Sequence, residues 1–437
     1  MLTMTNIGIV GGLGHVGLIQ SACLAKLGYK VIAYDIDMEK VKTIMKGEMP
    51  FQEQGLTELV TEGLNNNTLS FTSEISDLAE AEIVFICVGT PALPNGKSDL
   101  SHVYSAVDQI ARNRKKNCIA AVKSTVPIGT SRKLTEYLKD NNLSDKVTMV
   151  SNPEFLREGT GVKDFWEPDR IVIGAESKEA ANKVKQLYSP SEVPVINTTW
   201  ENSELIKYAS NAFLATKISF INEISQLCED VGADIRVISK GIGLDPRINP
   251  HFLQAGIGFS GPCLDKDLNS LINQFKEKQK KPLILESALQ VNEQQRASVV
   301  EKLQKHLENL RDKDIAVFGM AFKAETDDVR SSHSLPIIRK LLSLGANITV
   351  NDPWVKSPEQ GRISEAEVAG VEWISSPYRA AKDKDAVLLQ TAWQEYENLD
   401  YKKLCAEMKK PLVVDGRNLF NREEMESHGI VYVGVGI

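Results

Sequence analysis

Cysteine is scarce in this chain of 437 residues, and the six cysteines are scattered, with no C-x-x-C pair among them. A disulfide framework and a structural zinc site both rely on characteristic thiol spacings, so this sequence favours neither. The six histidines are equally dispersed, and we predict no metal site. This cysteine usage is typical of a reducing compartment and predicts a cytoplasmic location.

Positive charge is not in excess either, because 51 Lys and Arg stand against 58 Asp and Glu, a formal net charge of −7. Such a chain offers no basic field to a phosphate backbone, which argues against nucleic-acid binding. No apolar run approaches the ~20 residues that span a bilayer. The run near the start is interrupted by glycines and has no Lys or Arg before it, unlike an export signal. We predict no membrane contact.

The amino acids that are present fit a soluble globular protein, with 42% hydrophobic and 25% charged residues. The length predicts two or three domains. In the first third, short apolar runs predict buried strands at residues 6–11, 30–35, 81–89, 117–125 and 146–153. The segments between them are long enough for crossover helices, which favours a parallel sheet covered on both faces.

Residues 201–231 contain no Gly or Pro, and apolar or small residues lie on nearly every side of a helical wheel. They predict one helix, ~45 Å long at ~1.5 Å per residue, buried almost all round as a spine between domains and as a subunit interface. The opening pattern then returns, with strands expected at 313–322 and 346–353 around a helix at 335–345. The predicted fold class is α/β, with two Rossmann-like, doubly wound parallel-sheet domains joined by a helical central domain. The expected domains are residues 1–197, 198–300 and 301–437.

A glycine-rich turn follows the first predicted strand, where Gly12, Gly14 and Gly17 complete G-x-G-x-x-G. The first glycine would allow the tight turn, the second the approach of a pyrophosphate, and the third close packing of helix and strand. The phosphates would lie at the helix N-terminus. Asp35 ends the next strand, where a carboxylate binds ribose hydroxyls and repels a 2′-phosphate, so we predict NAD rather than NADP. The alternative is a glycine turn that binds nothing.

The second Rossmann-like segment lacks this signature. Its turn, FGMAFKAETDDVR, has one glycine and offers Lys323 and Arg330 instead. Cations at the carboxyl end of a parallel sheet suit an anionic ligand held by side chains. A solvated charged loop is the alternative interpretation.

A lone cysteine stands in the stretch GIGFSGPCLDKD, just before a helix expected to begin near Leu264. A helix N-terminus and the nearby Lys266 both favour the thiolate of Cys263, whereas Asp267 opposes it and is better placed to handle a proton or a water. Beside a nicotinamide, such a thiol suggests aldehyde oxidation through a thioester. An inert cysteine is the alternative.

Several long motifs occur in one order along the chain: GLGHVGL, VGTP, KSTVPIGT, SNPEFLREGT, ELIKYASNAFLATKISFINEI, GFSGPCLDKD, AFKAETDDVRSS and DGRNLF. Together they resemble the UDP-glucose/GDP-mannose dehydrogenase family from end to end. The resemblance implies an NAD-binding first domain, a central dimerisation domain and a last domain that binds the sugar nucleotide. It implies oxidation of a nucleotide sugar, UDP-glucose above all, from C6 alcohol to carboxylate with two NAD per turnover, as a step toward polysaccharides.

The family's functional positions transfer to numbered residues of this chain. The resemblance implies that Cys263 is the nucleophile, that Lys207 and Asn211 stabilise the oxyanion, and that the other catalytic residues handle protons and water. Arg247 would reach the active site of a partner subunit. The implied catalytic residues are Cys263, Lys207, Asn211, Asp267, Glu154 and Thr125. The implied cofactor residues are Gly12, Gly14, His15, Val16, Gly17, Asp35, Lys40, Thr90, Thr125, Glu158, Lys266 and Arg330. The implied substrate residues are Glu154, Phe155, Leu156, Lys207, Asn211, Arg247, Phe252, Leu253, Gln254, Gly256, Gly258, Phe322, Lys323 and Arg417.

Three positions depart from the family pattern. Ser260 stands where glycine is usual, Gln254 where a basic residue is frequent, and Gln54 where proline is usual. These departures keep another substrate open, such as GDP-mannose or a UDP-hexosamine. Family members that oxidise N-acetylated sugars, however, usually carry a histidine beside the cysteine and lack the Lys-Asp that follows it here. Two more distant functions also stay open: a 3-hydroxy-acid-type dehydrogenase without covalent catalysis, and a catalytically silent nucleotide-sugar binder.

Overall fold

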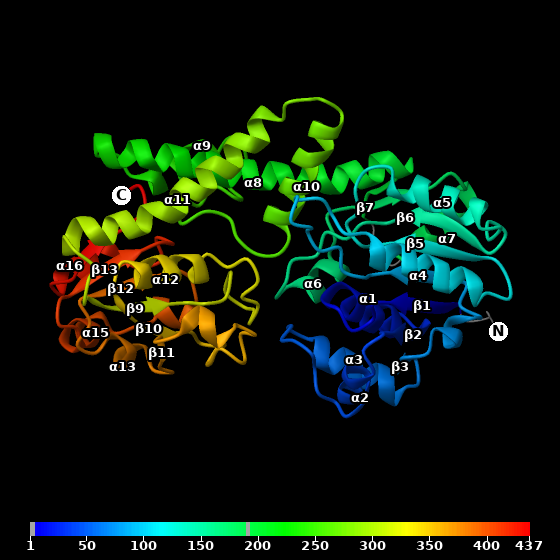
Figure 1. The fold of residues 1–437 in the computed structure, drawn as a ribbon, viewed down its shortest axis with the longest axis horizontal. Helices are drawn as coiled ribbons and strands as arrows, with labels where there is room; N and C mark the ends of the chain where they lie inside the picture. The colour runs from blue at the N-terminus through cyan, green and yellow to red at the C-terminus, as the bar shows by residue number, and fades with distance from the viewer. Residues whose placement is uncertain (1–4, 189–192) are drawn as a thin grey trace. The chain divides into compact units, whose positions relative to one another are not determined.

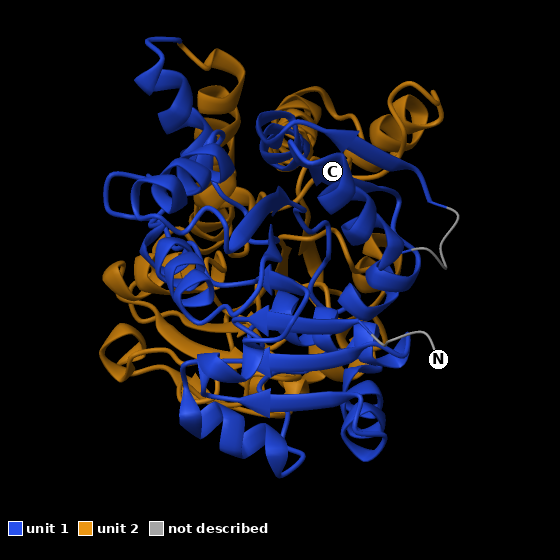
Figure 2. Cartoon of the chain, turned by 90° about the vertical axis from the view of Figure 1, so that its right-hand side faces the viewer, with its two compact units in different colours: residues 1–210, 269–280 blue, residues 211–268, 281–437 orange. Residues whose placement is uncertain are grey.

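The computed structural model describes residues 5–188 and 193–437. The chain divides into two compact units, one of residues 1–210 with 269–280 and the other of residues 211–268 with 281–437 (Figure 2). The helices α8 (Trp200–Val231) and α10 (Leu264–Glu277) each contribute to both. The three-domain division expected from the sequence stays a prediction.

The first unit is built on a sheet of eight strands in the order β3-β2-β1-β4-β5-β6-β7-β8 (Figure 1). The first six strands run parallel, the five that the sequence predicts and the unpredicted β3, but β7 pairs antiparallel with β6. The chain leaves β1 toward β2 and β3 and then returns to β4 on the other side of β1, which creates a switch point where ligands bind in such sheets. The strands are β1 (Asn6–Val10), β2 (Lys30–Tyr34), β3 (Leu69–Thr72), β4 (Ile83–Ile86), β5 (Cys118–Val122), β6 (Val147–Ser151), β7 (Ile171–Gly174) and β8 (Val195–Thr198).

Alternation along the strands divides the core of this unit between the two faces of the sheet. Ile7 and Ile9 of β1 pack in one cluster with α1, α3 and α7, whereas Val10 belongs to a second cluster with α4 and α5. A sheet buried on both faces explains why its strands read as continuous apolar runs. The helices are α1 (His15–Lys26), α2 (Met38–Met45), α3 (Leu56–Asn65), η1 (Ile75–Leu78), α4 (Ser101–Arg112), α5 (Thr130–Asp140), α6 (Gly161–Trp166) and α7 (Lys178–Gln186).

The second unit repeats the plan with six parallel strands in the order β11-β10-β9-β12-β13-β14. Its strands and surrounding helices share one large core, and the switch point lies between β9 and β12. The α/β class with two doubly wound sheets is therefore confirmed. The elements are α9 (Ile235–Gly243), α11 (Leu283–Leu307), β9 (Asp314–Phe318), α12 (Ser334–Ser343), β10 (Asn347–Asn351), η2 (Glu365–Val368), β11 (Glu372–Trp373), α13 (Pro377–Ala381), β12 (Ala386–Leu389), α14 (Gln394–Glu397), α15 (Tyr401–Glu407), β13 (Leu412–Asp415), α16 (Arg422–Ser427) and β14 (Val431–Val433).

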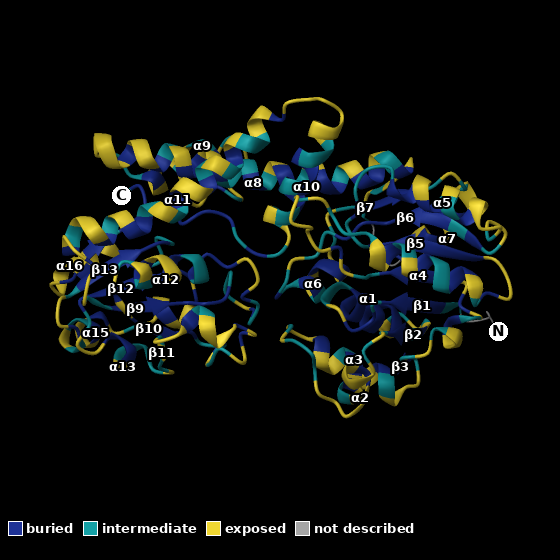
Figure 3. Ribbon diagram, in the orientation of Figure 1, coloured by how far each residue is buried: buried dark blue, intermediate teal, exposed yellow. Residues whose placement is uncertain are grey.

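The long helix α8 forms as predicted, and in the single chain one of its faces is buried and another is exposed. The expectation that a subunit interface completes its burial stays a prediction. Phe213, Phe220, Leu227 and Val231 recur at helical spacing and are 50–67% exposed. Exposed and buried residues alternate along the helix in Figure 3. The continuous apolar pattern of α8 therefore combines a buried face with an uncovered one.

None of the helices in the described ranges is both long and apolar enough to cross a membrane. The same residues contain no group of three or more His, Cys, Asp or Glu side chains arranged to hold a metal ion.

Candidate active site and cofactor site

The glycine-rich turn after β1 has the geometry of a dinucleotide cradle. A Cβ on Gly12 would lie 2.7 Å from the Cβ of Ala33 on β2, and one on Gly17 would lie 2.1 Å from the carbonyl oxygen of Gly11. Gly14 is exposed, and a Cβ there would lie no closer than 3.5 Å to another atom, the carbonyl oxygen of Gly11, so this position is less tightly packed than the other two. The tight turn itself falls on Gly11, with φ +78°, and not on Gly12 as the motif suggests.

The N-terminus of α1 carries no side-chain cap, which leaves its first N–H groups for an anion. Asp35 lies just beyond β2, and its carboxylate accepts hydrogen bonds from the backbone N–H of Leu13 at 3.2 Å and of Asp37 at 3.1 Å. The acid is thus held against the glycine turn. These residues fit NAD, because close-packed glycines, an exposed Gly14, an uncapped helix N-terminus and an acid suited to ribose hydroxyls lie together.

The cofactor candidates beyond the glycine turn occupy several elements. His15 and Val16 begin α1 and are half-buried, and Lys40 on α2 is exposed, 3.5 Å from Asp37. Thr90 donates its hydroxyl to the carbonyl oxygen of Thr125 at 2.9 Å, so the turns after β4 and β5 are joined. The remaining candidates are Glu158 in the first unit and Lys266 and Arg330 in the second, where Arg330 pairs with Asp328.

A buried ion pair in the first unit contains two of the predicted catalytic residues. Lys207 on α8 and Glu154 after β6 are 5% and 9% exposed, and their Nζ and Oε1 atoms are 3.0 Å apart. Burial disfavours the charged carboxylate, but the charge and hydrogen bond of Lys207, with the N–H of Leu156, outweigh it and lower the pKa of Glu154. Lys207 also lies 5.4 Å from the ring centre of Phe155.

The second unit holds the thiol and its polar neighbours. Cys263 is exposed and directly precedes α10, where the sequence predicts a helix to begin. One turn later, Asp267 is 1% exposed and accepts hydrogen bonds of 2.6 Å from Asn211 and from Lys266. Asn211 lies one turn beyond Lys207 on the same face of α8.

A cavity of about 270 Å³ in the second unit brings together predicted substrate residues from distant parts of the sequence. Arg417, which follows β13, donates hydrogen bonds to the carbonyl oxygens of Gln390 and Gly258. Burial lowers the pKa of Arg417 to about 10, so it is still a cation at neutral pH. The cavity is lined by Ile218, His251, Phe252, Gln254, Gly256, Gly258 and Arg417.

The substrate candidates outside this cavity belong to both units. Leu253 is buried, and Lys323 lies against the ring of Phe322, its neighbour in the chain. The side chain of Arg247 is 88% exposed and pairs with Asp245. The candidates in the first unit are Glu154, Phe155, Leu156 and Lys207.

The side chains that hold the loop between Phe252 and Cys263 were not predicted from the sequence. Asn222 accepts from the N–H of Gly256, and Asn292 bonds both the N–H and the carbonyl of Phe259. Ser260, which replaces the family glycine, donates to the carbonyl of Phe322 at 3.1 Å. Asparagines within apolar helices are the sequence signal for such anchors, and it is a weak one.

The turn after β9 in the second unit is held by an acid that follows the next strand, as Asp35 does in the first unit. Asp352, which follows β10, accepts hydrogen bonds from the N–H groups of Met320 and Ala321 and from the ring N–H of Trp393. The carboxylate of Asp352 thus fixes the turn after β9.

Family models match nearly the whole chain. The NAD-binding domain of the UDP-glucose/GDP-mannose dehydrogenase family matches residues 5–192, the central domain residues 201–294 and the UDP-binding domain residues 316–422. The chain belongs to this family. It is therefore an NAD-dependent nucleotide-sugar dehydrogenase, and the resemblance seen in its motifs is confirmed.

Named relatives cover the chain from end to end. It is 40% identical over 435 residues to UDP-glucose 6-dehydrogenase TuaD of Bacillus subtilis, covering 99% of this chain and 93% of the relative. It is 39% identical to UDP-glucose 6-dehydrogenase of Rhizobium meliloti, covering 97% and 98%. Among solved structures, a UDP-glucose dehydrogenase from Pyrobaculum islandicum superposes with a TM-score of 0.92 at 35% identity, covering 99% and 98%.

Proposed function

We propose that this enzyme oxidises the C6 alcohol of UDP-glucose to the carboxylate of UDP-glucuronate, with two NAD per turnover. The observation that carries the proposal is the exposed thiol of Cys263, one helical turn before a buried Asp267 that Asn211 and Lys266 hold in place. Without a neighbouring group that handles protons, such as Asp267, the thiol of Cys263 would fit a structural role as well as a catalytic one. The similarity to enzymes named UDP-glucose 6-dehydrogenase supports the choice of sugar.

The chemistry assigned to these residues runs in three stages. NAD, when bound, supplies the acceptor for each hydride that leaves C6. The first oxidation yields an aldehyde, and the thiolate of Cys263 adds to its carbonyl carbon, which gives a thiohemiacetal whose oxyanion Lys207 and Asn211 stabilise. Loss of a second hydride leaves a thioester. Water then attacks the thioester carbon, the sulfur leaves as thiolate, and the carboxylate product is released.

Proton handling falls to the carboxylates. Asp267 is buried one helical turn after Cys263, and the resemblance assigns it the proton of the alcohol or of the attacking water. Glu154 has a lowered pKa and is ionised at neutral pH, which suits a base more than an acid. Thr125 would help to hold the water. These roles follow the family resemblance, and the buried polar contacts support them.

The cavity beside Arg417 is proposed to take the nucleotide part of the substrate. The guanidinium hydrogen-bonds to two backbone carbonyl oxygens, which orient it without cancelling its charge, so it suits an anionic diphosphate. Phe252, with φ +64°, and the glycines 256 and 258 bring backbone groups to the cavity wall. Lys323 and Phe322 would complete the site.

The exposed face of α8 supports a homodimer. Its four large apolar side chains form a stripe that soluble monomers rarely leave uncovered. The exposed Arg247 agrees with a role in the active site of a partner subunit. We propose a cytoplasmic dimer in which α8 packs against its copy.

A panel of nucleotide sugars tests the proposal. NADH formation is measured at 340 nm with UDP-glucose, UDP-galactose, UDP-N-acetylglucosamine, UDP-N-acetylmannosamine and GDP-mannose. The highest kcat/KM is expected with UDP-glucose. A higher kcat/KM with another sugar would contradict the choice of UDP-glucose and identify that sugar as the substrate. The difference in sugar preference would then be assigned to Ser260 and Gln254 and tested with Ser260→Gly and Gln254→Lys variants.

A further inference from the structure

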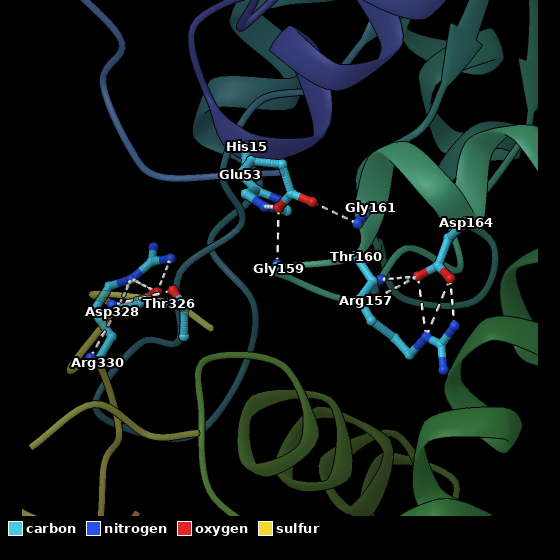
Figure 4. Close-up of polar contacts among 10 residues, drawn as sticks. All are labelled: His15, Glu53, Arg157, Gly159, Thr160, Gly161, Asp164, Thr326, Asp328 and Arg330. Atoms are coloured by element: carbon cyan, nitrogen blue, oxygen red, sulfur yellow. Dashed lines mark hydrogen bonds and ion pairs between the residues drawn. The ribbon is translucent and has the colours of Figure 1, made fainter. Parts of the chain in front are cut away.

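A buried carboxylate lies beside the cofactor cradle, outside the residues that the family resemblance implies. Glu53 belongs to the connection between α2 and α3, and its side chain is fully buried. Its Oε2 accepts from the N–H of Gly159 at 2.8 Å and lies 2.8 Å from Nε2 of His15, and its Oε1 accepts from the N–H of Gly161 at 2.7 Å (Figure 4). One carboxylate thus holds three groups from two other segments.

Both of those segments belong to the predicted cofactor site. His15 is the first residue of α1, next to Gly14 of the glycine-rich turn. Gly159 directly follows Glu158, and Gly161 begins α6. The carboxylate therefore links the start of α1 to the turn after Glu158, and Glu53 is the common partner that sets the His15 ring and that turn.

Packing around the carboxylate leaves little freedom. The ring of Phe51 lies against that of His15, with centroids 4.8 Å apart. A Cβ on Gly161 would lie 2.6 Å from the Cδ1 of Ile19 and 3.7 Å from the Oε1 of Glu53. Because glycine has no side chain, the N–H of Gly161 can approach the carboxylate of Glu53 closely. Burial raises the cost of the charged form, but the hydrogen bond and charge of His15 and the two N–H groups outweigh it and lower the pKa of Glu53.

We propose that Glu53 is a positioning residue for NAD, which orients His15 at the start of α1 and the turn 157–161 for cofactor binding. The inference rests on the proposed location of NAD at the glycine-rich turn. Because its side chain is fully buried, Glu53 acts through these neighbours and not by touching NAD itself.

The glutamine variant isolates the hydrogen-bonding role. Glu53→Gln keeps the shape of the side chain but replaces one acceptor oxygen by an NH₂ donor, so the groups that faced that oxygen lose their partner. Glu53→Asp keeps the charge and shortens the reach by one methylene, and it serves as a second variant if the first folds poorly. The matched control is Glu58→Gln, an exposed glutamate on α3.

The experiment measures NAD and UDP-glucose affinity separately by calorimetry, together with the melting temperature and amide exchange of residues 157–166. We expect Glu53→Gln to raise the Kd for NAD about tenfold, equivalent to about 1.4 kcal/mol, and Glu53→Asp to raise it less. The Kd for UDP-glucose should stay within twofold of wild type. The amides of 157–166 should exchange faster in the protein without NAD, and Glu58→Gln should change none of these.

Asp35→Ser, measured in parallel, distinguishes a failure of the inference from a failure of the cofactor site. If Asp35→Ser weakens NAD binding and Glu53→Gln does not, the inference is wrong and the cofactor site stands. If Glu53→Gln weakens both ligands alike and lowers the melting temperature, Glu53 has only a structural role and the inference is wrong. If neither variant changes NAD affinity, NAD does not bind at this turn, and the inference fails with the proposed cofactor site.

Discussion

Replacing Lys207 by methionine leaves Glu154 as a buried carboxylate without its ion-pair partner. Both residues are at least nine-tenths buried, and the ion pair measures 3.0 Å. Breaking a buried pair from one side costs ~3–5 kcal/mol, because the remaining charge is uncompensated. We therefore expect Lys207→Met to lower the free energy of unfolding by about 3–5 kcal/mol in urea titrations, and to abolish oxidation because the oxyanion loses a donor.

Glu154→Gln, the second change in a double-mutant cycle, removes the stranded charge. The double variant should recover most of the lost stability but none of the activity. Lys183→Met, which breaks an exposed pair with Glu179, is the matched control and should cost about 1 kcal/mol or less.

The pH dependence of this pair has a definite sign. In the wild type the folded-state pKa of Glu154 is lowered, so its stabilisation is present above the ordinary carboxyl pKa and is lost as pH falls through the lowered value. Without Lys207, burial is opposed only by the N–H of Leu156 and the charge of Lys123, so we expect the pKa of Glu154 to rise. The deficit of Lys207→Met should then be present at neutral pH and shrink as the carboxyl takes up a proton on acidification. A deficit below about 1 kcal/mol, the size expected of an exposed pair, or one that Glu154→Gln fails to relieve, would refute the reasoning.

Further predictions concern the thiol, the cofactor and the dimer. Cys263→Ser should acylate and then hydrolyse very slowly, because an ester is cleaved less readily than a thioester; mass spectrometry should show the acylated chain, and near-normal steady turnover would rule out the covalent role. Asp35→Ser should weaken NAD binding and narrow the gap to NADP, since each charge-assisted hydrogen bond contributes ~1.5–3 kcal/mol; a wild type that already prefers NADP would contradict this assignment. Arg247→Ala and Cys263→Ala chains should each be inactive alone and recover activity when mixed, and no recovery despite proven subunit exchange would place Arg247 outside the partner's site. Phe220→Asp should shift the protein toward monomers in sedimentation, whereas an unchanged dimer would move the interface away from this face of α8.

Much of the fold follows from local patterns in the sequence. The strands β1, β2, β4, β5 and β6 lie within the predicted apolar runs, because a sheet covered on both faces requires continuous apolar strands. The antiparallel β7 was not predicted, since strand direction depends on tertiary pairing and leaves no mark on composition. For a related reason the sequence could not assign the two faces of α8, because a spine packed within the chain and a subunit interface both make the helical wheel apolar.

The site was partly predictable for the same physical reasons. The glycines and the acid after β2 mark the cofactor turn in the local sequence. The motif predicts the tight turn at Gly12, however, whereas the positive φ falls on Gly11. Glu53 lies far in sequence from its partners, at separations of 38 to 108 residues, so no local pattern could identify it. Long-range hydrogen bonds to backbone N–H groups are visible only once the fold is known.

The yield of NADH per sugar is the most direct test of covalent four-electron oxidation. With UDP-glucose limiting and NAD in excess, the reaction is followed at 340 nm to completion, and the products are separated by chromatography. Trapping of the aldehyde by Cys263 predicts two NADH for each UDP-glucose consumed, with UDP-glucuronate as product and no free aldehyde. One NADH per sugar, with the aldehyde accumulating in solution, would contradict it.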